Sequence, residues 1–82
     1  MARRGRRRRA ESRFGEQAEA LAAWLRAFRE QAGLTQEQLA ASAGVAVATV
    51  RKIETGAVVE PGYFTVLALM RALGAQFDDL PA

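Results

Sequence analysis

The stretch of residues 33–56, GLTQEQLAASAGVAVATVRKIETG, decides the fold of this chain. Thr35 is a favourable N-cap, and Gln38 completes a capping box with it, so that the two residues satisfy the first backbone donors of a helix reciprocally. We expect this helix to cover residues 35/36–42. Gly44 then ends it, because glycine adopts a left-handed backbone conformation without a Cβ penalty.

A second short helix is expected directly after this turn, from about Val47 to Thr55. Val50 and Ile53 are three residues apart, which places both on one buried side of that helix. Ala46 offers no side-chain oxygen at the N-cap, which costs about 1 kcal/mol relative to Ser or Thr. Two short helices joined by a glycine turn have the layout of a helix-turn-helix motif.

A longer amphipathic helix is expected before the motif, from about Glu16 to Ala32. Its apolar residues recur at three- and four-residue intervals, which indicates a face directed towards a core; they are Leu21, Trp24 or Leu25, Phe28 and Ala32. Trp24 and Leu25 are adjacent, so only one of them lies at the centre of this face. We assign the centre to Leu25 and the edge of the core to Trp24, with contact to a partner protein as the alternative for Trp24.

Two further helices are expected after the motif, at about 63–73 and 77–80. Pro61 restricts the residue before it away from helical conformations and can prepare the start of a helix, and Gly74 ends the first of the two. The helix at 63–73 is apolar on more than one side. We expect Phe77 and Leu80 to fold back onto the core.

Composition limits the functions open to these 82 residues. The chain has no cysteine and no histidine, so it lacks thiolates, the usual general base and the commonest transition-metal ligand. We expect no catalytic residue, no metal, no cofactor and no enzymatic activity, and we interpret Asp78 and Asp79 as first-turn charges of the last helix. No segment reaches the ~18 apolar residues of a membrane span or has the pattern of a secretory signal, which favours a cytoplasmic location.

Charge is distributed unevenly along the chain. Residues 1–13 carry seven arginines against Glu11, a net charge of +6, whereas residues 14–82 carry −3. We expect 1–13 to be a flexible basic arm, disordered when free, attached to a domain formed by 14–82. Such an arm can follow DNA phosphates or enter a minor groove through Arg3, Arg4, Arg6, Arg7, Arg8 and Arg9. The alternatives are a solvated tail or a general attraction to anionic surfaces such as RNA or lipid headgroups.

At this point a resemblance to a known family becomes specific. The segment 25–80 resembles the Cro/CI (XRE-type) helix-turn-helix family of bacterial and phage DNA-binding regulators. The matching positions are Arg29, Gly33-Leu34-Thr35-Gln36, Leu39-Ala40, Gly44-Val45, Val50, Ile53-Glu54, Gly56, Pro61 and Ala72-Leu73-Gly74. The resemblance implies an all-α, five-helix, lambda-repressor-like domain located in the bacterial cytosol or nucleoid.

The resemblance also implies which residues contact double-stranded DNA. The helix at 47–55 is the recognition helix in the major groove, with the candidate contacts Val47, Ala48, Thr49, Arg51, Lys52 and Thr55. Val47 and Ala48 cannot hydrogen-bond a base, although either can pack against a thymine methyl group. Arg51 and Lys52 can read guanine or neutralise phosphate, and we regard Lys52 as the better base reader. We therefore expect modest base-specific readout.

Two further positions take roles from the resemblance. Gln36 corresponds to a residue that meets a phosphate at a helix N-terminus; its alternative is an ordinary first-turn residue. Arg29 and Glu54 are expected to form a structural salt bridge, with Arg29 close to a phosphate. The alternative for this pair is two separate surface charges worth well under ~1 kcal/mol.

The function expected from these features is a sequence-reading transcriptional regulator, such as a repressor, that binds a pseudo-palindromic operator as a homodimer. In related proteins, the helix corresponding to 63–73 and the segment after it form the dimer contact. One alternative is an antitoxin-like interaction module that binds a partner protein, a toxin or an effector, and regulates its own operon. The other is a non-specific nucleic-acid binder driven by the arm.

Overall fold

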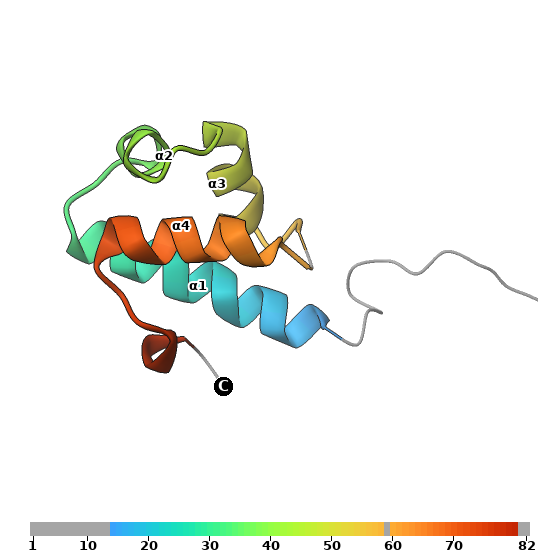
Figure 1. Cartoon of the computed structure of the whole chain (residues 1–82). Helices are drawn as coiled ribbons and strands as arrows, with labels where there is room; N and C mark the ends of the chain where they lie inside the picture. Colours follow the sequence, from blue (N-terminus) through green and yellow to red (C-terminus); the bar gives the residue numbers. More distant parts are fainter. Residues whose placement is uncertain (1–13, 59, 81–82) are drawn as a thin grey trace, which may run out of the picture.

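The computed structural model describes residues 14–58 and 60–80, and these fold into four α-helices and one 3-10 turn without a strand (Figure 1). The elements are α1 (Gly15–Gln31), α2 (Gln36–Ala43), α3 (Val47–Glu54), α4 (Tyr63–Leu73) and η2 (Phe77–Asp79). The expected all-α class and the four long elements are confirmed, each within about a residue of its expected bounds. The count of five helices is not confirmed, because the segment after α4 forms only a three-residue 3-10 turn.

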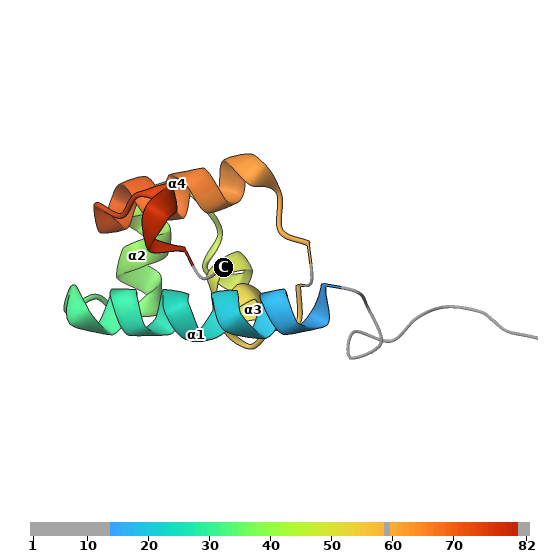
Figure 2. The ribbon, with the colours of Figure 1, turned by 90° about the horizontal axis from the view of Figure 1, so that it is seen from below.

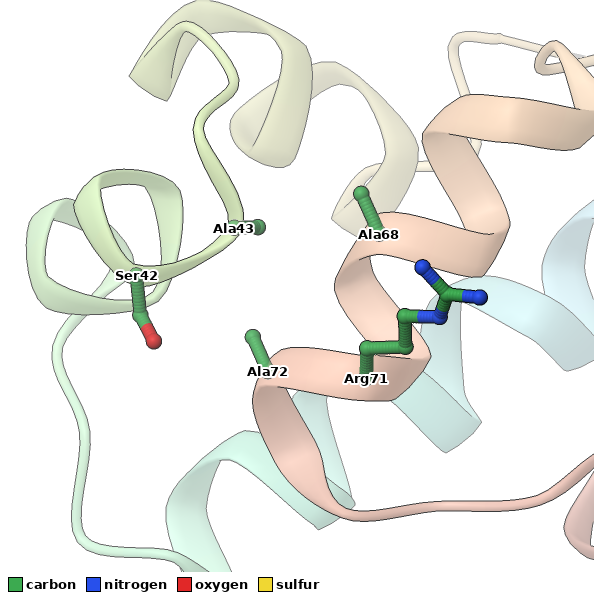
Figure 3. A pocket seen from close by; sticks show the side chains of 5 residues that line it. All are labelled: Ser42, Ala43, Ala68, Arg71 and Ala72. Carbon is green, nitrogen blue, oxygen red and sulfur yellow. The ribbon is translucent and has the colours of Figure 1, made fainter.

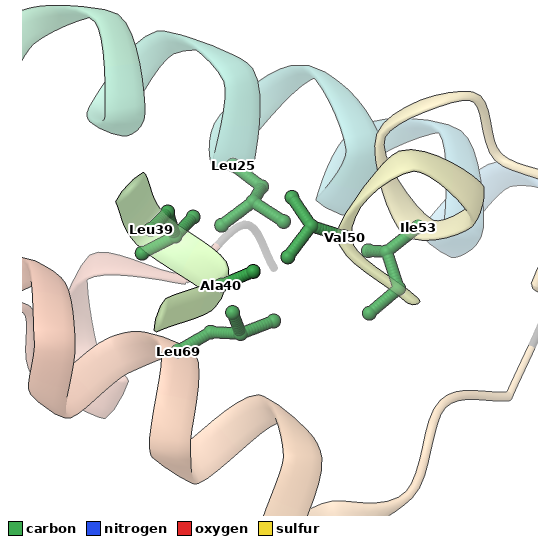
Figure 4. Close-up of a cluster of buried hydrophobic side chains, with 6 residues drawn as sticks. All are labelled: Leu25, Leu39, Ala40, Val50, Ile53 and Leu69. Carbon is green, nitrogen blue, oxygen red and sulfur yellow. The ribbon is translucent and has the colours of Figure 1, made fainter. Parts of the chain in front are cut away.

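The core lies where the four α-helices meet. α2 packs against α3 and α4, and α3 packs against α1. α2 and α3 lie together above α1 and α4 in Figure 1, and Figure 2 shows α1 and α4 at opposite edges of this arrangement, seen from below. Every α-helix contributes at least one side chain to the buried cluster in Figure 4, which consists of Leu25, Leu39, Ala40, Val50, Ile53 and Leu69. The small side chain of Ala40 allows α2 to approach its neighbours closely at this point.

The turn between α2 and α3 is fixed by its own backbone hydrogen bonds. Gly44 has φ +74° and donates to the carbonyl of Ala41 at 3.3 Å, while Val45 donates to the carbonyl of Ala40 at 3.0 Å. This pair of bonds is the Schellman arrangement, which requires a left-handed residue at the position of Gly44. Each of the other three α-helices is followed, within two residues of its last residue, by a glycine of positive φ, namely Gly33, Gly56 and Gly74.

The two helices of the motif differ in how their N-termini are capped, as the sequence predicts. Thr35 Oγ1 accepts a hydrogen bond from the backbone N–H of Gln38 at 3.0 Å, and Gln38 Oε1 accepts one from the N–H of Thr35 at 2.9 Å. This confirms the capping box of α2. Ala46, at the N-cap of α3, has an extended backbone and makes no side-chain capping bond. The start of α3 is therefore held by the turn and by tertiary packing.

The burial of residues on α1 confirms most of the core-facing positions expected for this helix. Leu25 is buried, together with the small side chains of Ala18 and Ala22. Trp24 is half-buried, packs at the margin of the core and stacks on Phe28 with ring centroids 4.5 Å apart. The expectation for Ala32 is wrong: it follows the last residue of α1 and is exposed, because the turn at the end of the helix carries it away from the core.

The C-terminal turn also differs from the expected helix. The side chain of Asp79 accepts a hydrogen bond from the backbone N–H of Gln76 at 2.9 Å, which closes the turn locally. Asp78 and Asp79 both lie in its first turn, as expected. Leu80 is half-buried, whereas the side chain of Phe77 lies outside the described part of the structure.

Candidate nucleic-acid interface

α3 has two faces of opposite character. Its inner face is buried and consists of Val50, Ile53 and Glu54. Its outward face is exposed and has helical spacing i, i+3, i+4, i+7, and it consists of Ala48, Arg51, Lys52 and Thr55. The outward face therefore offers two cations, one methyl group and one hydroxyl group along about two turns of helix.

The carboxylate of Glu54 lies inside the protein, on the inner face. Its residue is only 2% exposed, and an unpaired charge at that depth would be strongly unfavourable. Arg29 from α1 satisfies it with two hydrogen bonds, Nε to Oε2 at 2.7 Å and Nη2 to Oε1 at 3.1 Å. Gln36 from α2 adds a third, Nε2 to Oε1 at 3.0 Å. One carboxylate thus joins α1, α2 and α3.

Arg29 extends this network to the turn before α2. Its Nη1 donates to the carbonyl of Leu34 at 2.9 Å. The hydrogen bonds to Glu54 raise the pKa of Arg29 above its ordinary value, against the opposing effect of burial. A basic group with a raised pKa stabilises the folded state at every pH below its unfolded value, and it loses that contribution only as the pH rises through the folded value. Arg29 is therefore charged across the whole physiological range.

A second arginine of α1, Arg26, holds the end of α3. Its Nη1 donates to the backbone carbonyl of Glu54, the last residue of the helix. A cation at this position also interacts favourably with the negative end of the helix dipole. The sequence alone did not indicate this role for Arg26; its position three residues before Arg29 on the same helix is the signal that could have indicated one.

Gln36 connects the buried network to the surface. While its Nε2 donates to Glu54, its Oε1 accepts a hydrogen bond from Arg51 Nε at 3.4 Å. Arg51 also forms an ion pair with Glu37, Nη2 to Oε2 at 2.7 Å. The side chain of Gln36, the residue expected to meet a phosphate, is thus engaged within the protein, and Glu37 is a further residue at this surface that the sequence alone did not indicate.

The other candidate DNA contacts on α3 differ in how far they are buried. Val47 is half-buried and packs against the core, so it is less available to a thymine methyl group than Ala48, which is exposed. Thr49 is also half-buried, whereas Thr55 donates its hydroxyl to the carbonyl of Lys52 at 3.0 Å. Lys52 is exposed and has no ion pair within the part of the chain that the structure describes.

Comparison with known proteins agrees with this arrangement. The family described as "Helix-turn-helix domain" matches residues 20–82, most of the chain. The protein belongs to this family. The family is of the XRE type, consistent with the Cro/CI resemblance, and its motif indicates a DNA-binding regulator. None of the curated proteins compared with the chain matched it.

The arm arginines of this helix-turn-helix protein lie outside the described residues. They are Arg3, Arg4, Arg6, Arg7, Arg8 and Arg9. In the described part, no helix is long and apolar enough to cross a membrane, and no three acidic side chains gather into a potential metal site.

A shallow hollow of about 410 Å³ lies between the end of α2 and α4, separate from the outward face of α3. Its walls are Ser42, Ala43, Ala68, Arg71 and Ala72 (Figure 3). Three of these side chains are single methyl groups, and Arg71 is its only ionisable group. The hollow therefore has no pair of groups suited to acid–base chemistry.

Proposed function

We propose that this helix-turn-helix protein is a sequence-reading transcriptional regulator that inserts α3 into the major groove of double-stranded DNA. The observation that carries this proposal is the outward face of α3, which combines Arg51 and Lys52 with the exposed methyl of Ala48. The buried Glu54 network fixes the orientation of that face. A rigid helix presenting a few side chains to base edges is the arrangement by which this motif reads sequence.

The roles of the individual side chains follow from their surroundings. Lys52 has no ion pair among the described residues, so it is the first candidate for hydrogen bonding to guanine O6 and N7. Ala48 can pack against a thymine methyl, and Thr55 lies at the end of the same face. The backbone N–H of Gln36, at the first turn of α2, remains suited to a phosphate. The arm adds phosphate or minor-groove contacts that do not depend on base identity.

We infer that the protein acts as a homodimer on a pseudo-palindromic operator in the bacterial cytosol or nucleoid, as a repressor in the simplest case. A two-fold dimer places two recognition helices about 34 Å apart, in successive major grooves. Tyr63 and Phe64 are 59% and 78% exposed, and their rings contact edge to face at 5.2 Å. An exposed aromatic pair on α4 supports the assignment of a protein contact to this helix. The proposal includes no enzymatic activity and no cofactor.

The same aromatic pair favours a second candidate, an antitoxin-like module whose α4 binds a toxin or effector while α3 regulates its own operon. The two candidates share DNA binding but differ in the partner. Sedimentation of the purified protein distinguishes them: a homodimer that Phe64→Ser converts to monomer supports the first. A monomer that dimerises only with the product of a neighbouring gene supports the second.

The deciding experiment is selection of binding sites from random duplex DNA near physiological salt, with the full-length chain. Enrichment of a two-fold-symmetric sequence is the expected result. A Lys52→Ala variant should enrich a different or degenerate base at one position in each half-site. Binding without enrichment would instead support the arm-driven, non-specific alternative, and absence of binding to any duplex would overturn the proposal.

A further inference from the structure

Arg51 is bound by two residues at the start of α2, Gln36 and Glu37. Its Nη2 lies 2.7 Å from Glu37 Oε2, and its Nε donates to Gln36 Oε1 at 3.4 Å. Both side chains of the ion pair are largely exposed, 51% for Arg51 and 64% for Glu37. The pair therefore lies at the surface that the proposed function presents to DNA, and it links the first turn of α2 to the outward face of α3.

The ion pair reduces the positive charge that the outward face of α3 presents to a polyanion such as DNA. Arg51 and Glu37 together carry no net charge, so Lys52 is the one cation of the outward face without a carboxylate partner among the described residues. Arg51 can neutralise a phosphate only after it has left Glu37. An exposed ion pair is weak enough to be exchanged in this way, because both groups return readily to water.

We propose that Glu37 is a specificity-determining residue that acts through Arg51, an inference that rests on the proposed DNA-binding function. Glu37 provides Arg51 with a counterion inside the protein. On an arbitrary sequence, Arg51 can only trade this carboxylate for a phosphate, an exchange of one anion for another. Opposite a guanine, the planar guanidinium can form two hydrogen bonds to O6 and N7. These bonds compensate for the loss of the ion pair with Glu37.

The consequence is that Glu37 suppresses binding to arbitrary DNA more than binding to the operator. Discrimination of this kind is obtained by weakening the complex with arbitrary DNA. The carboxylate of Glu37 weakens that complex because it is left unpaired beside phosphates when Arg51 leaves it. Gln36 contributes by keeping the guanidinium oriented, since its own amide is fixed by the buried Glu54. In this interpretation, the buried network sets the position from which Arg51 reads DNA.

The test compares Glu37→Gln with Glu16→Gln by titration of the full chain with a random-sequence duplex and with the selected operator, at several salt concentrations. Both glutamates are exposed and lie in the first turn of an α-helix, so the second variant controls for net charge and for the helix dipole. We expect Glu37→Gln to tighten binding to the random duplex about two- to fivefold, the range of an exposed ion pair. The salt slope should steepen by about 0.9, as for one additional phosphate contact. Operator affinity should change less.

An Arg51→Gln background separates action through Arg51 from direct repulsion. In that background, Glu37→Gln should leave the affinity for random DNA and the salt slope unchanged. An equal gain with and without Arg51 would show that Glu37 merely repels phosphate, and an equal gain from Glu16→Gln would show a general charge effect. Either result overturns the inference while leaving the proposed function intact.

A measurement without DNA tests the ion pair independently of the proposed function. In the free protein, Glu37→Gln should shift the side-chain Nε–H resonance of Arg51 while that of Arg71, on α4, stays in place. An unshifted Arg51 resonance would mean that the ion pair does not form in solution, and the inference would fail on that ground alone. Absence of duplex binding with a normal shift would instead overturn the proposed function.

Discussion

Arg29 of α1 and Glu54 of α3 form a bidentate ion pair whose carboxylate is almost wholly buried, with the shorter hydrogen bond at 2.7 Å. The two residues are 25 positions apart in the sequence. Since Gln36 of α2 binds the same carboxylate, the pair fixes the three helices that position the outward face of α3. The contribution of the ion pair to the free energy of unfolding and its contribution to DNA affinity can be measured in separate experiments.

Removal of one partner of this pair should be costly. Arg29→Met leaves the Glu54 carboxylate with only Gln36, and we expect a loss of about 3–5 kcal/mol in the free energy of unfolding. The measurement is urea denaturation followed by fluorescence of Trp24, the single tryptophan of the chain. Adding Glu54→Leu to Arg29→Met should recover most of the loss, because two apolar side chains replace the pair without leaving a buried charge. Equal stability of Arg29→Met and the unmodified chain would contradict a buried ion pair.

An N-cap introduced before α3 should stabilise the protein. Ala46 has the extended backbone of an N-cap residue, with φ −70° and ψ 142°, but makes no side-chain capping bond. Ala46→Ser should raise the free energy of unfolding by about 1 kcal/mol, since the hydroxyl can accept from the first turn of α3. Ala46→Val serves as the control and should give no such gain, because valine is as poor an N-cap residue as alanine. The urea midpoint should move while the denaturant slope stays constant.

Substitution of alanine for Gly44, in the turn between α2 and α3, should destabilise the protein because of the backbone conformation at this position. A Cβ at Gly44 would meet nothing within 4 Å, yet its φ is +74°. Gly44→Ala should therefore cost about 1–2 kcal/mol through conformational strain rather than through a clash. Gly62 is the matched control: its φ is −64°, and a Cβ there would lie 3.8 Å from Thr65 Oγ1. A cost for Gly62→Ala as large as that for Gly44→Ala would refute this explanation.

Lys52→Ala should alter the preference among DNA sequences without affecting the fold. Because Lys52 is exposed and has no ion pair among the described residues, its truncation should leave the thermal midpoint nearly unchanged. Binding should weaken by about 1–3 kcal/mol only at sites where a bidentate contact to a base is lost. Thr49→Ala, at a half-buried position, is the parallel variant. A uniform loss across all sequences would assign Lys52 to phosphate instead.

Neutralisation of the arm should act differently from any substitution on α3. Replacing Arg3, Arg4 and Arg6 to Arg9 by glutamine should weaken binding to every duplex by a similar factor. The salt slope should decrease by about 0.9 for each lost phosphate contact. The bases enriched in a binding-site selection should stay the same. A change of the enriched sequence confined to A·T-rich flanks would show that the arm reads the minor groove.

Local signals in the sequence predicted the secondary structure well, and particular residues show why. Thr35 and Gln38 satisfy each other within one turn, and Gly44 and Val45 close α2 through bonds to residues three and five positions before them, respectively. Such bonds depend on neighbours along the chain. The 3-10 turn at η2 was harder to predict, because three residues carry little periodicity.

The sequence by itself determined the all-α fold, the position of the motif and the outward spacing of Ala48, Arg51, Lys52 and Thr55. Tertiary structure alone decided that Glu37 meets Arg51, that Arg26 holds the end of α3 and that Gln36 turns its amide inwards to Glu54. These contacts join residues 14 to 28 positions apart. Helical periodicity fixes only which side of a helix a residue faces; which side chains meet across two helices depends on how the core packs them together.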